Sequence, residues 1–173
     1  MSWIEKMLNY ASKALLAVTM LCLGLMMAHV IADVVLSGLF SQPIPGTSEV
    51  VAYYYMIGAV FLPIPLVEMR RASIQVDLFY NIVNNNIKKI MLVAAYLAQF
   101  VFFILMARQT GLDAFESFIK SEYVQSQIQI YVWPGRFFLP LGFGLGAIIS
   151  LFHLIKYIIS PAWSSRTRIS SGQ

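Results

Sequence analysis

The sequence predicts an all-α integral membrane protein with four transmembrane helices and both termini in the cytoplasm. Of its 173 residues, 59% are hydrophobic and only 12% are charged. Soluble domains average about 25% charged and 45–50% apolar residues, so this chain needs lipid as its solvent. Long apolar runs recur at four places. At about 20 residues per crossing, the chain has length for four spans but none for a soluble catalytic domain.

The first predicted span is residues 14–40, an apolar run of about 27 residues. A cleaved signal peptide has an apolar core of about 7 to 15 residues followed by a small-residue cleavage site, so we expect this run to be retained. Pro43, Pro45 and Gly46 follow it and predict a tight turn before the next helix.

The second predicted span is residues 50–67. Ser48 and Glu49 precede it, where a hydroxyl and a negative charge suit the exposed N–H groups of a helix start. Pro63 and Pro65 each remove a backbone donor near its end, which predicts a kinked helix. The third and fourth predicted spans are the apolar runs 90–107 and 137–159.

The basic residues are distributed by side of the membrane. Three lie on one predicted side, namely Arg108, Lys120 and Arg136. Nine lie on the side that holds both termini, namely Lys6, Lys13, Arg70, Arg71, Lys88, Lys89, Lys156, Arg166 and Arg168. The positive-inside rule therefore places both termini in the cytoplasm. This asymmetry accounts for the net charge of +4, and we expect no nucleic-acid partner.

Two connecting segments have a regular pattern of their own. Residues 75–87 carry apolar side chains at three- and four-residue spacing, which predicts an amphipathic helix along the inner membrane surface. An apolar helical stripe continues over 112–119, so the third helix is expected to extend outward. Polar and apolar residues alternate over 121–131, which favours an extended connection. We expect one membrane domain, residues 1–163, and a flexible cytoplasmic tail, residues 164–173.

His29 and Asp33 form the one buried polar pair that the sequence predicts. They are four residues apart in the first span and share a helix face, and ionisable groups in lipid need a partner. We favour a structural role, in which Asp33 pairs with His29, with an arginine such as Arg108 or Arg136, or with a neighbouring subunit. The alternative is proton or ion handling.

A haem anchor is the main cofactor hypothesis to weigh, because such subunits are helical bundles with axial histidines. His29 and His153 are the only histidines. At about 1.5 Å per residue they lie at depths that differ by about 13 Å, which argues against joint ligation of one haem. His153 is expected to be a packed or interfacial residue.

The other catalytic and binding patterns point to helix packing rather than chemistry. Cys22 is the single cysteine, so thiol clusters and disulfides have no second member. Gly142, Gly144 and Gly146 form a small-residue stripe that predicts close helix packing in the fourth span. We therefore predict no catalytic residue, no metal site and no cofactor, and hence no enzyme.

Three short motifs resemble the DctQ-like small membrane subunit of tripartite ATP-independent periplasmic (TRAP) transporters. They are Pro45-Gly46-Thr47-Ser48-Glu49, the inner loop from Arg70 to Leu78, and the entry to the fourth span from Trp133 to Gly142. In that loop Arg71, Ala72 and Ser73 stand where the family often has Gly, Gly and His. The motif residues that the resemblance selects are Glu49, Arg70, Arg71, Asp77, Trp133, Pro140 and Gly142.

The resemblance implies a bacterial inner-membrane protein that carries no substrate itself. In such systems a periplasmic binding protein captures an organic acid, such as a C4-dicarboxylate or a sialic acid, and a large permease subunit moves it with sodium. The small subunit would be a stationary scaffold for that permease, surrounded by membrane lipids. Docking of the binding protein is expected at Asp113, Glu116, Lys120 and Glu122; the alternative is that Asp113 and Glu116 are simply a solvated helix face. Alternatives from other classes are a haem- or quinone-type anchor of a respiratory complex and a small independent channel or carrier.

Overall fold

The computed structural model describes residues 3–70, 85–125 and 128–159. In chain order the elements are α1 (Trp3–Phe40), α2 (Thr47–Val50), η1 (Val51–Met56), α3 (Ile57–Phe61), α4 (Ile64–Met69), α6 (Asn85–Ile119), β1 (Tyr123–Gln125), β2 (Gln129–Tyr131), α7 (Trp133–Arg136) and α8 (Phe138–Ile159). Four stretches are long and apolar enough to cross a membrane: Trp3–Phe40, Thr47–Met69, Val93–Ile119 and Trp133–Tyr157. The predicted class, an all-α protein with four spans, is confirmed.

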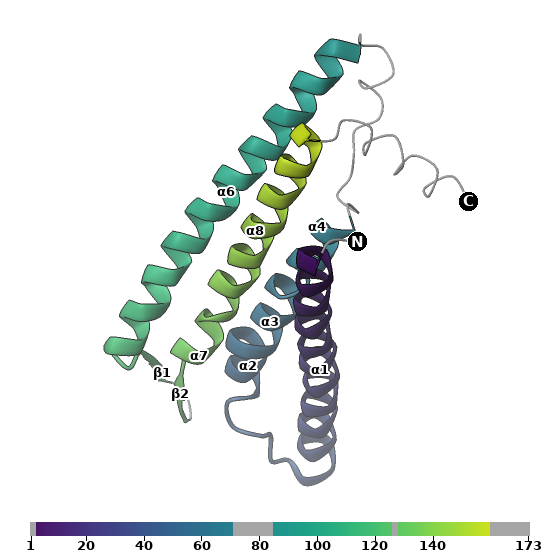
Figure 1. Ribbon diagram of the computed structural model, residues 1–173. Coiled ribbons are helices and arrows are strands. Elements are labelled where there is room, and N and C mark those ends of the chain that lie inside the picture. The colour runs from purple at the N-terminus through teal and green to yellow at the C-terminus, as the bar shows by residue number, and fades with distance from the viewer. Residues whose placement is uncertain (1–2, 71–84, 126–127, 160–173) are drawn as a thin grey trace, which may run out of the picture.

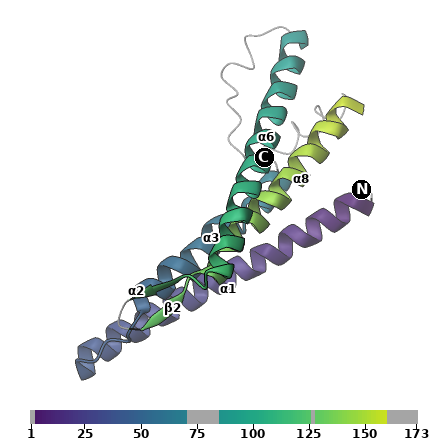
Figure 2. The ribbon, with the colours of Figure 1, turned by 90° about the vertical axis from the view of Figure 1, so that its left-hand side faces the viewer.

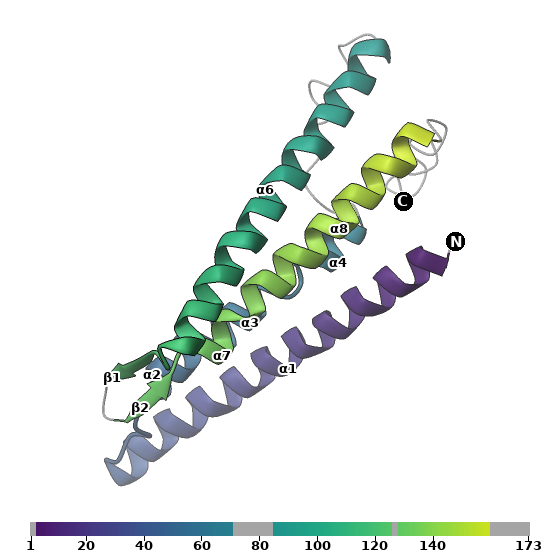
Figure 3. The same ribbon diagram turned by 60° about the vertical axis from the view of Figure 1, so that its left-hand side comes forward.

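The helices run side by side in one bundle (Figure 1). We refer to the end that holds Trp3 and the last turn of α8 as the terminal end, and to the end that holds β1 and β2 as the hairpin end. Helix α8 lies between α6 on one side and α1 on the other, as the turned view also shows (Figure 3). Helix α8 packs along α6 and also contacts α3 and α4, whereas α1 packs against η1, α3 and α4.

The second span is a broken helix. It starts in α2 after Gly46, passes through the π-helical segment η1, and is interrupted between Phe61 and Ile64. The interruption falls at Pro63, which lacks a backbone donor and directly precedes α4, so the kink predicted from the prolines is confirmed. The sequence did not predict the π-helical segment.

Close packing of α7 and α8 against the second span depends on two glycines. A Cβ atom at Gly142 would lie 2.9 Å from the carbonyl carbon of Phe61, and one at Gly135 would lie 3.0 Å from that of Tyr53. A side chain at Gly146 would meet the Phe103 ring at 3.2 Å, whereas one at Gly144 would have no neighbour within 4 Å. The predicted packing stripe is therefore confirmed at Gly142 and Gly146 and wrong at Gly144.

The extended connection predicted after the third helix is confirmed as an antiparallel hairpin. Strands β1 and β2 pair with Tyr123 opposite Tyr131 and Gln125 opposite Gln129. The hairpin covers Gly46, whose positive φ of 83° favours glycine and against which the Ile128 side chain packs. Figure 2 shows the two strands beside the start of the second span.

Two predictions fall outside the described residues. The amphipathic segment 75–87 is described only from Asn85, where α6 begins, and the tail 164–173 is not described. The third helix continues to Ile119, well past the end of the predicted span at residue 107.

Candidate functional site at the hairpin end

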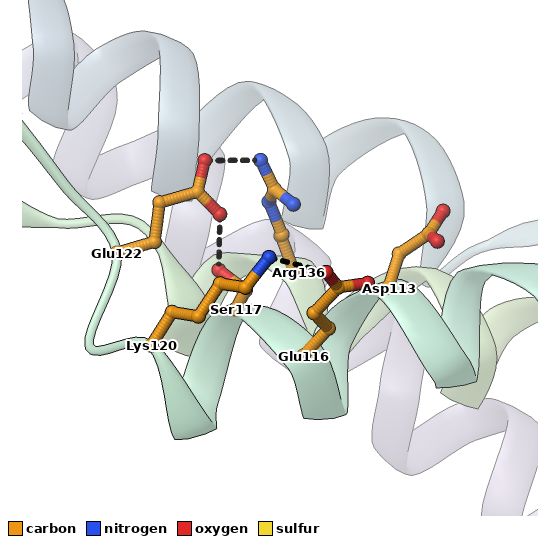
Figure 4. A pocket seen from close by; sticks show the side chains of 6 residues that line it. All are labelled: Asp113, Glu116, Ser117, Lys120, Glu122 and Arg136. Atoms are coloured by element: carbon orange, nitrogen blue, oxygen red, sulfur yellow. Dashed lines mark hydrogen bonds and ion pairs between the residues drawn. The ribbon is translucent and has the colours of Figure 1, made fainter.

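A polar pocket of about 430 Å³ lies where α6, the hairpin and α7 meet. It is lined by Asp113, Glu116, Ser117, Lys120, Glu122 and Arg136 (Figure 4). It includes all four residues that were predicted from the sequence to dock a binding protein. The other two lining residues, Ser117 and Arg136, were not among the predicted docking residues.

Helix and turn geometry bring these side chains together. Asp113 and Glu116 are three residues apart in α6, and Lys120 follows directly after the last residue of that helix; residues three or four apart in a helix are neighbours. The chain leaves the helix at Ser121, which has a positive φ of 47°, and the Glu122 backbone N–H then donates to the Ser117 carbonyl at 3.0 Å. This turn points the Glu122 side chain back over the last turn of α6.

Glu122 is the centre of the hydrogen-bond network in the pocket. Arg136 Nη2 donates to Glu122 Oε1 at 2.9 Å, and Ser117 Oγ donates to Glu122 Oε2 at 2.8 Å. The Val132 N–H donates to the Glu122 carbonyl at 2.9 Å. Both strands of the hairpin and the start of α7 are thereby tied to the end of α6. An arginine at the edge of the loop could have suggested this pair, but its partner could not be chosen from spacing alone.

The remaining charges lie on the exposed side of the pocket. Lys120 pairs with Glu116 one turn away, and Asp113 accepts a hydrogen bond from Gln109 at 3.1 Å. Hydrogen bonding to Glu116, and the negative charge of that group, raise the pKa of Lys120 above its ordinary value. Three carboxylates against two cations leave one net negative charge, so the pocket presents an exposed, slightly acidic surface.

Aromatic rings pack behind the pocket. The centre of the Trp133 ring lies 5.0 Å from that of Phe118 and 6.4 Å from that of Phe137. The ring centres of Phe137 and Phe115 are 5.9 Å apart, and all three pairs are edge-to-face. Such pairs stabilise by about 0.5–1.5 kcal/mol beyond burial of their area. Trp133, selected by the motif resemblance, therefore anchors α7 to the end of α6.

The other motif residues are spread over the molecule. Glu49 is half-buried in α2, and Arg70 is exposed where α4 ends. Pro140 lies in α8 opposite Gly111 of α6. A Cβ atom added at Gly111 would lie 3.8 Å from the Cβ of Pro140. Gly142 makes the close backbone contact described above. Arg71 and Asp77 lie outside the described residues.

His29 and Asp33 do not form the buried pair that the sequence suggested. Both are half-buried. Asp33 Oδ1 instead accepts a hydrogen bond from the Ile44 backbone N–H at 2.6 Å, and the His29 ring packs edge-on to Tyr55 at 6.0 Å. A backbone donor in the loop after α1 therefore replaces the side-chain partner, because that loop folds back over the end of the helix.

The second histidine has a different environment. His153 is buried in α8, with its ring 6.3 Å from Tyr96 of α6 and 6.0 Å from Phe152. The two histidines thus contact different neighbours on different helices, so this geometry offers no support for a haem held between them. Among the described residues, no group of three His, Cys, Asp or Glu side chains is placed to hold a metal ion.

Two polar contacts near the terminal end were not anticipated. Glu68 of α4 is only 4% exposed and accepts a hydrogen bond from Gln99 Nε2 of α6 at 2.6 Å. Lys156 of α8 forms an ion pair with Glu5 of α1, and Glu5 is also buried. A lone glutamate after two prolines was a signal for the first contact, but nothing local in the sequence indicates the second.

These features define a multi-pass membrane protein whose helices are joined by hydrogen bonds and ion pairs near both ends of the bundle. Comparison with known protein families then matches residues 26–159 to the family described as tripartite ATP-independent periplasmic transporters, DctQ component. The match covers 134 of 173 residues, and the chain belongs to this family as a DctQ-like small subunit of a TRAP transporter. The family is a transporter component and not a known enzyme family. The chain matches no curated protein and no solved structure.

Proposed function

We propose that this chain is the stationary scaffold of its transporter, bracing the large permease subunit during sodium-coupled, binding-protein-dependent uptake of an organic acid. The observation that carries the proposal is the uneven burial of the four spans. We compare the most apolar 18-residue stretch of each span. In the fourth span 44% of these residues are buried, against 11% in α1 and 6% in the span within α6. The two outer helices thus leave large apolar faces for lipid and for a membrane partner.

Internal rigidity also supports a scaffold. Gly142 of α8 and Gly135 of α7 let the helix backbones pack closely against the second span, and such close packing favours one fixed arrangement of these helices. The Glu5–Lys156 and Glu122–Arg136 pairs fix the two ends of the bundle. An elevator-type permease needs such a fixed surface against which its moving domain can slide.

The proposed location is the bacterial inner membrane, with both termini in the cytoplasm. Lys6, Lys13, Arg70 and Lys156 gather near the terminal end, and the positive-inside rule assigns that end to the cytoplasm. The hairpin end would then face the periplasm. Reporter fusions at Gly46 and Glu122 that read cytoplasmic would overturn this orientation.

The hairpin-end pocket is proposed to dock the periplasmic binding protein. Its carboxylates are exposed and mixed with cations, as is usual for contacts that steer association and fix register. Reversing Asp113 and Glu116 to lysine should raise the concentration of binding protein needed for half-maximal uptake by about tenfold. The matched control exchanges these two residues for each other's type and keeps the charge. If both variants need the same concentration of binding protein for half-maximal uptake, docking at this pocket is contradicted.

The scaffold role is tested by reconstitution. The chain is co-purified with the large permease subunit, inserted into liposomes, and supplied with binding protein, a sodium gradient and either a C4-dicarboxylate or a sialic acid. We expect uptake only with all components, and a loss of about tenfold or more when this chain is omitted or sodium is balanced across the membrane. Equal uptake by the large subunit alone would refute the proposal. A haem absorption band in the purified chain would favour the anchor alternative.

A further inference from the structure

One face of the outer half of α6 combines a single arginine with exposed apolar side chains. Arg108, Leu112, Phe115 and Ile119 follow one another at spacings of four, three and four residues, which places them on one side of the helix. Leu112 is 52% exposed, Phe115 62% and Ile119 78%, and Arg108 is exposed as well. One edge of the Phe115 ring packs against Phe137, and the rest of the ring is open. We call these four residues the α6 outer face.

Arg108 has no acidic partner among the residues that the structure describes. No described residue makes an ion pair or a hydrogen bond with it, and its helical neighbours are Ile104, Leu105, Gly111 and Leu112. An arginine stays charged in every protein environment, and an ionisable group among apolar side chains at a membrane needs a counter-charge or acceptors. The α6 outer face therefore requires a partner that supplies one.

The level of this face argues for a protein partner rather than lipid alone. Asp113, Glu116 and Lys120 lie on another side of the same turns of α6 and line a polar pocket. Such a pocket needs water, so these turns lie outside the hydrocarbon. The apolar residues of the α6 outer face lie at the same depth along the helix as this pocket, namely Leu112, Phe115 and Ile119. The last of them, Ile119, is about 16 Å beyond Arg108 along the helix axis. Contiguous apolar side chains exposed at a hydrated level mark protein contacts.

We propose that the α6 outer face is the contact that the large permease subunit covers near the periplasmic surface, with a carboxylate of that subunit paired to Arg108. This inference rests on the proposed scaffold function and adds to it the face and the charge of the contact. Figure 1 places α6 at the edge of the bundle, with α7 and α8 along its inner side, so its opposite side is open to a partner. The pocket side of α6 stays open for the binding protein.

Cysteine labelling tests the location. Cys22 is the single native cysteine and is first replaced by serine. Ile119→Cys on the proposed face and Glu116→Cys on the pocket side are then treated with a membrane-impermeant maleimide in liposomes, with and without the large subunit and without binding protein. We expect the large subunit to slow labelling at position 119 by about tenfold or more and to leave position 116 unchanged.

The other outcomes overturn the inference. Equal labelling at position 119 with and without the large subunit would mean that the face is not covered by it. Slow labelling at position 119 in the chain alone would mean that lipid covers the face. Failure of the unmodified chain to form any complex would refute the scaffold function itself, and the inference with it.

Substitution of Arg108 tests the charge. Arg108→Leu should reduce recovery of the large subunit with this chain by about tenfold or more, because a carboxylate would be left buried and unpaired, and Arg108→Lys should restore most of it. Gln109→Leu, next along the helix and on the pocket side, is the matched control and should not change recovery. Equal recovery with Arg108→Leu and Gln109→Leu would refute the pairing.

Discussion

Replacement of Gly142 by alanine gives the most direct test of the packing described above. The new Cβ would lie 2.9 Å from the carbonyl carbon of Phe61 and still nearer to its oxygen. The obstacle is backbone and cannot rotate away, so α8 and α3 must separate. Gly144 is two residues along the same helix and has nothing within 4 Å, which makes Gly144→Ala a matched control.

The size of the effect follows from this geometry. Carbon atoms in contact normally lie about 3.5–4.0 Å apart, so the two helices must move by about 1 Å. Overpacking of this kind costs about 1–3 kcal/mol, and replacing a helical glycine by alanine returns about 0.5–1 kcal/mol. The two ranges together give a net loss at Gly142 of up to about 2.5 kcal/mol, with about 1–2 kcal/mol expected from their middle values. Gly144→Ala keeps only the gain.

Thermal unfolding in detergent, followed by tryptophan fluorescence, measures the difference. For a chain of this size 1 kcal/mol shifts Tm by about 2–4 °C, so Gly142→Ala should melt about 2–8 °C lower than the wild type. Gly144→Ala should melt at the same temperature or slightly higher. Equal Tm values for the two variants would refute the reasoning, because they differ only in the contact with Phe61.

Three further predictions follow from single contacts. Gln99→Leu removes one donor to the buried Glu68 carboxylate and should cost about 1.5–3 kcal/mol, and an unchanged Tm would contradict this. Asp33→Ala removes the acceptor for the Ile44 N–H and should cost about 1 kcal/mol, whereas Asp33→Asn keeps an oxygen there and should retain sodium-coupled uptake. Assembly without coupling in Asp33→Asn would instead indicate ion handling. The raised pKa of Lys120 means that its contribution to stability is complete below the unfolded-state pKa of about 10.4 and is lost as pH rises through the higher folded value. Its pair should therefore contribute equally at pH 7 and pH 9, as measured by comparing Tm of wild type and Lys120→Gln.

Local sequence patterns were sufficient for the elements of this fold. Apolar run length predicted the four spans, Pro63 predicted the break in the second one, and alternation over residues 121–131 predicted the hairpin. Each of these signals depends on residues close together in the chain. The π-helical segment Val51–Met56 had no such signal, because its apolar and aromatic residues fit an ordinary α-helix equally well.

Contacts between helices could not be predicted in the same way. Periodicity says which face of a helix is apolar, but it does not say how two helices are rotated against each other. The sequence pattern therefore selected four residues that line one pocket, and it missed Arg136, whose position depends on the angle of α7. That these residues dock a binding protein stays a prediction. The sequence pattern also suggested His29 as the partner of Asp33 from helical spacing, whereas the real donor is a backbone N–H from a folded-back loop.

The contacts that were not predicted join elements that are far apart in the sequence, and they bear on the proposed scaffold function. Glu5 and Lys156 are 151 residues apart in sequence, and their pair joins the first and last described helices near the terminal end. Glu122 and Arg136 join α6 to α7 at the hairpin end. Between these two ends the backbone at Gly142 packs closely against Phe61 of the second span. Under the proposed scaffold function, these contacts predict that motion in the transporter occurs where the outer surfaces of α1 and α6 meet a partner, and not within this subunit.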